Sequence, residues 1–175
     1  MNAKNNIVLL FICCIYSCHS QEWVTVKLDS FVSISFPHKP QETGNAAINK
    51  VLVDDVEGLY SVGYIVVGFI PEGPAGLDSI YERMRQTIVI SKTVTDVSVK
   101  TLRINGLIAR EFNYKGKEGN GTPVIVKTLG LFINEKIYQC TYSTVDTVKY
   151  AVPLKRFLQS FTLSKDETYT QFTTK

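Results

Sequence analysis

The sequence predicts an α+β fold in which a central antiparallel sheet is packed by about two helices. Three observations predict it. Segments that alternate apolar and polar residues come in two runs, and only two stretches have the spacing of an amphipathic helix. Turns such as Asn105-Gly106 and Asn134-Glu135 join neighbouring segments, which implies antiparallel hairpins. Runs of strands with few helices are typical of α+β domains.

The composition is that of one ordinary globular domain. The chain has 175 residues, of which 45% are hydrophobic and 20% are charged, and its net charge is +3. These values exclude intrinsic disorder and collagen-like repeats. A net charge of +3 also does not indicate the clustered basic face that a nucleic-acid partner would need.

The first 20 residues have the three-part pattern of a signal peptide. Lys4 supplies a positive start, Ile7–Tyr16 is an unbroken apolar run, and small polar residues follow. A membrane span needs about 20 apolar residues, so this run is too short to be one. We therefore expect export and removal of the leader.

Two cleavage sites are compatible with this leader. Cleavage after Ser20 would give a soluble secreted product. Alternatively, Ile15–Cys18 resembles a bacterial lipobox, so residues 1–17 would be a lipoprotein signal and Cys18 the lipidated N-terminus. The lipoprotein alternative is slightly favoured. It predicts a periplasmic or envelope-anchored protein that meets the membrane only through its lipid.

Four strands are expected before the first helix. Proline cannot continue a ladder, so Pro37 and Pro40 end the second of them. The fourth is rich in β-branched and aromatic residues. Residues 41–49 are polar and are expected to form a loop. The four strands are residues 23–28, 31–36, 50–56 and 59–69.

The first helix is expected over Leu77–Ile90, after the helix-breaking run Pro71–Gly76. Its apolar residues fall near an i, i+3, i+4, i+7 stripe, which indicates a face that packs on the sheet. These residues are Leu77, Ile80, Tyr81, Met84 and Ile88.

The second run of strands is expected to form two hairpins on either side of a polar loop at 115–122. The strands are residues 97–104, 107–114, 123–132 and 136–144.

A final helix is expected near the C-terminus. Asp146 or Thr147 can cap it, and Pro153 would either kink it or mark its first turn. Residues 21–164 are therefore expected to form a single α+β domain. The polar residues 165–175 are expected to be a flexible C-terminal tail.

Several of these features together resemble the PsbP-like superfamily, which includes secreted bacterial members. They are an early strand ending in Phe36–Pro40, a central helix, two hairpins, and the closing run Phe157–Leu163. The resemblance extends over about residues 22–164. It implies a central antiparallel sheet between helices, as an α/β/α sandwich. It also implies binding to other proteins, with no common catalytic residues to carry over.

The body of the chain offers no convergent set of catalytic groups. Cys140 shares a strand face with Tyr138 and Tyr142, so a buried and inert thiol is expected. A Cys–His pair could form only with His38, which lies in a loop between two prolines. No catalytic residue is therefore predicted.

Metal and cofactor sites are not expected either. Structural zinc needs four Cys or His ligands, and the body of the chain cannot supply them. Asp54 and Asp55 are adjacent on a strand and should point to opposite faces. An enzyme that uses Asp54, Asp55 or Glu57 with His38, such as a hydrolase, is the less favoured alternative.

The sequence thus predicts a non-enzymatic envelope protein that binds another protein or a small ligand. Tyr60, Tyr64 and Tyr114 are candidates for an exposed aromatic patch on the sheet, which is a usual docking site. A carrier of lipids or hydrophobic ligands is the alternative. That alternative predicts an apolar cavity of ~300–1,000 Å³.

Overall fold

The structure is a computed structural model that describes residues 22–43, 48–91, 93–117, 121–165 and 167–174. It confirms the α+β class, because two helices accompany antiparallel strands within these residues. The helices are α1 (Gly73–Ser91) and α2 (Ala151–Gln159). The strands are β1 (Val24–Lys27), β2 (Val32–Phe36), β3 (Gln41–Glu42), β4 (Ile48–Asp55), β5 (Gly58–Val66), β6 (Thr93–Ile104), β7 (Leu107–Lys117), β8 (Pro123–Ile133), β9 (Lys136–Thr144) and β10 (Thr162–Leu163).

Seven strands form a large sheet in the order β3-β4-β5-β9-β8-β7-β6, and β1-β2-β10 form a small one. Both predicted hairpins of the second run are confirmed. Their turns have positive φ at both central residues: 50° and 85° at Asn105 and Gly106, and 47° and 65° at Asn134 and Glu135. Such turns match the right-handed twist of the flanking strands.

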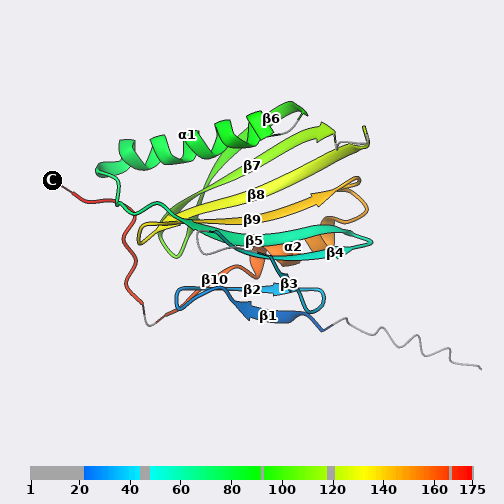
Figure 1. The fold of residues 1–175 in the computed structure, drawn as a ribbon, viewed down its shortest axis with the longest axis horizontal. Helices are drawn as coiled ribbons and strands as arrows, with labels where there is room; N and C mark the ends of the chain where they lie inside the picture. Colours follow the sequence, from blue (N-terminus) through cyan, green and yellow to red (C-terminus); the bar gives the residue numbers. More distant parts are fainter. Residues whose placement is uncertain (1–21, 44–47, 92, 118–120, 166, 175) are drawn as a thin grey trace, which may run out of the picture.

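The two faces of the large sheet are covered by different layers (Figure 1). On one face, α1 packs on β7 and β8 through a cluster that includes Phe112 and Phe132. On the other face lie α2 and the small sheet, and the main core is between them and the large sheet. That core contains Phe36, Tyr60 and Phe157, with ring centroids 5.1–5.5 Å apart in the two contacts of Phe157.

α1 leaves part of its own face of the sheet open. Tyr81 holds the helix over β7 and β8, because its hydroxyl donates to Ile108 O (2.7 Å) and accepts from Phe132 N (3.1 Å). Beside the helix, Leu59 and Ile65 of β5 remain 39% exposed. The uncovered strip of β5 and β9 is where the candidate site lies.

The segment between β5 and α1 differs from the sequence prediction. β5 ends at Val66 instead of residue 69, and Val67 N then donates to Glu135 O (2.8 Å) as the chain leaves the sheet. α1 begins at Gly73 and not at residue 77. Pro74 is compatible with this start because a first-turn residue has no intrahelical N–H bond to lose.

The limits of several strands also differ from the sequence prediction. The expected loop 41–49 contains β3 and the start of β4. β6 begins before residue 97, at Thr93, and β7 continues to Lys117 into the expected polar loop. Each extension pairs with a neighbouring strand, and the ladder hydrogen bonds of that pairing outweigh the polar composition.

Pro153 lies in the first turn of α2, which was one of its two predicted positions. The predicted helix cap at Asp146 or Thr147 was wrong, because the N-cap of α2 is Tyr150, which makes no side-chain cap bond. Asp146 instead caps the turn before the helix, where its Oδ1 accepts from the backbone N–H groups of Val148 and Lys149, both at 2.9 Å.

The C-terminal segment packs on the domain over its described residues, which differs from the flexible tail expected at 165–175. Gln171 is only 7% exposed. Its side chain accepts from Ile108 N (2.6 Å) and donates to Ile108 O (2.7 Å) and Phe132 O (3.0 Å). Composition predicted a solvated tail, but these buried backbone groups need partners and the tail supplies them.

Candidate functional site

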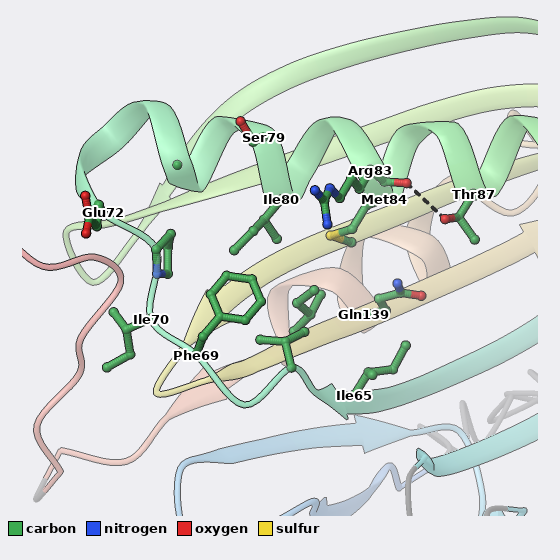
Figure 2. Close-up of a pocket in the computed structure, with 14 residues that line it drawn as sticks. Ile65, Phe69, Ile70, Glu72, Ser79, Ile80, Arg83, Met84, Thr87 and Gln139 are labelled. Carbon is green, nitrogen blue, oxygen red and sulfur yellow. Dashed lines mark hydrogen bonds between the residues drawn. The ribbon is translucent and has the colours of Figure 1, made fainter.

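A cavity of about 510 Å³ lies between α1 and the open strip of the large sheet (Figure 2). Ile80 and Met84 of α1 form one wall, and Ile65 with the segment 67–71 forms the other. Gln139 of β9 belongs to the floor. Most lining side chains are apolar, and the volume is within the range of ligand pockets, ~300–1,000 Å³.

The hollow above β9 arises from two glycines. Gln139 is paired with Gly63 on β5 and with Gly130 on β8. Because a glycine has no side chain, the space beside Gln139 is not filled from within the sheet. Met84 occupies the space over Gly130. The space over Gly63 stays open and forms part of a second hollow.

This second hollow, of about 290 Å³, continues the cavity along the sheet. The two share five lining residues, so together they form one groove: Ile65, Met84, Thr87, Ile137 and Gln139. The continuation is more polar than the first cavity, since Ser61, Thr141 and Ser143 line it beside Lys50. The groove is therefore amphipathic, with its apolar end near Phe69.

Arg83 is the cation that lines the first cavity. Figure 2 shows its side chain over the cavity, on the helix side opposite Phe69. Among the described residues, no acidic group forms a salt bridge with Arg83. The hydroxyls on either side of it are used within the helix: Ser79 donates to Ala75 O and Thr87 to Arg83 O.

The side chain of Gln139 is the second polar group. Its amide points into the groove from the sheet (Figure 2) and makes no side-chain hydrogen bond to a described residue. Arg83 and Gln139 both line the first cavity. A guanidinium and an amide both carry N–H donors, so unused donors of both residues face the same space.

The position of α1 over the groove depends on Tyr81. Burial raises the pKa of its phenol to about 12, so the hydroxyl stays protonated and keeps its two bonds to β7 and β8. The neighbouring residue Ile80 and, one turn on, Met84 are thereby held against the sheet.

The predicted aromatic patch of Tyr60, Tyr64 and Tyr114 is not found; this prediction was wrong. Tyr60 is fully buried in the main core, where its ring centroid is 4.8 Å from that of Tyr142. Tyr114 is buried on the α1 face of the sheet. Tyr64 is half-buried against Tyr138. Alternation along the strands therefore separates Tyr114 from the other two residues.

Cys140 and His38 do not form a pair. Cys140 is fully buried, and burial raises the pKa of its thiol well above the ordinary value. His38 is exposed, and its Nε2 lies 3.5 Å from Asp55 Oδ2. A protonated, enclosed thiol is a poor nucleophile.

Asp54, Asp55 and Glu57 line one small hollow of about 210 Å³ at the β4–β5 turn, but each carboxylate has a different setting. Asp54 is exposed, while Asp55 contacts His38. Glu57 Oε2 accepts from the Tyr60 hydroxyl at 2.9 Å. Within the ranges that the structure describes, no cluster of His, Cys, Asp and Glu residues could hold a metal ion.

The predicted leader, residues 1–20, and the proposed lipidation site Cys18 lie outside the described residues. Among the residues that are described, neither helix has the length and hydropathy to cross a membrane.

Sequence reasoning did not identify the groove. One signal was available: Gly63 and Gly130 each interrupt a strand-like segment, and a glycine within a strand often marks the close approach of a ligand or another element. The pairing of both glycines with Gln139 appears only in the sheet register.

Comparison with known proteins gives a fold likeness only. No family model matches the chain, and no curated protein matches it. A crystal structure of a protein of unknown function from Pseudomonas aeruginosa is similar with a TM-score of 0.53 and 14% identity, over 83% of this chain and 99% of that chain. A Bacteroides thetaiotaomicron structure has a TM-score of 0.46 at 14% identity, over 77% of this chain and 46% of its own.

Proposed function

We propose that this protein is a non-enzymatic binding module that holds the apolar part of a small ligand in the groove between α1 and the sheet. The observation that carries the proposal is the cavity of about 510 Å³, lined mainly by apolar side chains. Each methylene that a ligand buries there would contribute about 0.8 kcal/mol to binding.

The surroundings of the cavity support its interpretation as a ligand site and not as a packing gap in the core. The main core lies on the other face of the sheet, and the cavity is not enclosed by it. Ile65 and Phe69, at the rim, are 39% and 49% exposed. Apolar side chains beside an open cavity lose contact with water when an apolar ligand enters.

The place of action is a second part of the proposal. The leader pattern of residues 1–20 supports export, with Cys18 as the favoured point of lipid attachment. The placement of α1 and α2 on opposite faces of one antiparallel sheet supports the proposed resemblance to the PsbP-like superfamily.

The test uses a neutral apolar fluorophore, N-phenylnaphthylamine, titrated with the purified protein. Ile65→Trp places a larger ring in the groove, whereas Val66→Trp adds the same ring on the next residue, which points to the opposite face. We expect saturable binding that is at least about tenfold weaker in Ile65→Trp and nearly unchanged in Val66→Trp. No saturable binding, or equal weakening in both variants, would contradict the proposal.

A further inference from the structure

We infer that the ligand is an anionic single-chain amphiphile, whose charged group is bound by Arg83 and Gln139. This inference rests on the proposed function, because it names the chemical class of the ligand in the same groove. Its apolar chain would lie against Ile65, Ile80 and Met84.

The first argument is charge. Arg83 lines the cavity and has no salt-bridge partner among the described residues. By contrast, Arg85 on the same helix is paired with Glu82 at 2.6 Å, and Arg110 is paired with Asp78. An unpaired guanidinium over an apolar cavity attracts an anion, and its planar donors fit a carboxylate.

The second argument is hydrogen bonding. The Gln139 amide faces the same cavity from β9 and has no side-chain partner among the residues described. Its N–H donors and those of Arg83 approach the cavity from the sheet and from the helix, respectively (Figure 2). A headgroup with two acceptor oxygens satisfies both, whereas a cationic headgroup satisfies neither.

The third argument fixes the orientation. Glu72 lines the end of the cavity near the start of α1, about three helical turns before Arg83. The guanidinium of Arg83 attracts an anionic headgroup away from that end. The headgroup therefore lies at the Arg83 end, where the groove continues into its polar part beside Ser61 and Lys50.

Titration calorimetry with decanoate, decanol and decyltrimethylammonium tests the inference near neutral pH, below the micellar concentrations of the two charged ligands and below the solubility limit of decanol. These ligands share one chain and differ in headgroup charge. We expect decanoate to bind at least about tenfold more tightly than the cationic ligand, and its affinity to fall with added salt. Equal affinity for all three ligands would overturn the inference and leave the proposed function standing. Failure of all three to bind would overturn both.

Three variants locate the headgroup. Arg83→Gln should weaken decanoate binding by about tenfold or more and leave decanol within about twofold. Arg83→Lys should retain part of the decanoate affinity. Arg85→Gln removes the same charge from the same helix outside the cavity, and it should change neither ligand. Unchanged decanoate binding in Arg83→Gln, or an equal loss in Arg85→Gln, would overturn the assignment.

Discussion

The side chain of Met84 packs directly over Gly130. A Cβ built on Gly130 would lie 2.6 Å from Met84 Cε and 3.2 Å from its Sδ. Met84 belongs to α1 and lines both parts of the groove, while Gly130 belongs to β8. One missing side chain in the sheet therefore decides how closely the helix approaches it and how much of the groove remains free.

Gly130→Ala should displace Met84 and destabilise the protein. The thioether is the end of a flexible side chain and can move away from the new Cβ, so we expect a loss of about 1 kcal/mol in the free energy of unfolding by urea, with weaker binding of N-phenylnaphthylamine. Combining it with Met84→Ala removes the overlapping atoms. The double variant should then be more stable than the sum of the two single effects predicts. Simple additivity would show that the two residues do not interact.

Asp29 should make stability depend on pH at the acid end. Burial raises the pKa of its carboxyl, but this is outweighed by hydrogen bonds from Lys136 Nζ (2.7 Å), the Tyr138 hydroxyl (2.6 Å) and Phe31 N, so the pKa is lowered overall. A lowered folded-state pKa means that the unfolded chain binds the proton more readily. The ionised carboxylate of Asp29 therefore stabilises the folded state. This contribution is present above the unfolded pKa of about 3.9 and is lost as pH falls through the folded pKa.

Asp29→Asn tests that dependence. At neutral pH the variant should be less stable by about 1 kcal/mol, a figure that allows for solvent screening of the partly exposed pair. The difference from the unmodified protein should shrink as pH falls from 5 toward and below the folded pKa, measured as urea unfolding free energies at each pH. A difference that stays constant down to the lowest pH would show that the carboxylate charge has no role.

Cys140 should resist alkylation in the folded protein. Its thiol is fully buried and its pKa is raised by burial, so little reactive thiolate exists at neutral pH. Iodoacetamide treatment followed by peptide mass spectrometry distinguishes Cys140 from the three cysteines within the predicted leader. We expect modification in urea and almost none without it. Rapid labelling of the native protein would instead revive a nucleophilic role for this residue.

Gln171 should anchor the C-terminal segment. Gln171→Ala removes the side-chain acceptor of the Ile108 N–H and one donor each to Ile108 O and Phe132 O, while Ile108 O keeps its bond from the Tyr81 hydroxyl, and the expected cost is about 1–3 kcal/mol in the free energy of unfolding. Thr174→Ala, at an exposed position in the same segment, is the matched control and should be nearly neutral. Equal stability of the two variants would mean that the segment is not held through Gln171.

The sequence by itself determined the local structure. Asn105-Gly106 identifies the first hairpin, because positive φ at two successive residues favours Asn and Gly. Asn134-Glu135 marks the second only as a polar pair between two strand-like segments, since Glu is an unusual residue at a φ of 65°. The apolar stripe of the first helix was also recognisable, since Leu77, Ile80, Tyr81 and Met84 are buried as their spacing predicts. These features depend on residues close together in the chain, so periodicity and turn chemistry suffice to predict them.

Only the tertiary structure decided what each face of the sheet contacts. Alternation indicated that Tyr60 and Tyr64 share one face of the sheet, but it did not indicate which face a second layer would cover. The predicted aromatic patch failed for that reason. The groove also depends on tertiary structure. Gly63 and Gly130 are far apart in sequence, and they flank Gln139 only because β9 lies between β5 and β8. Strand order is set by long-range packing, which local propensities do not encode.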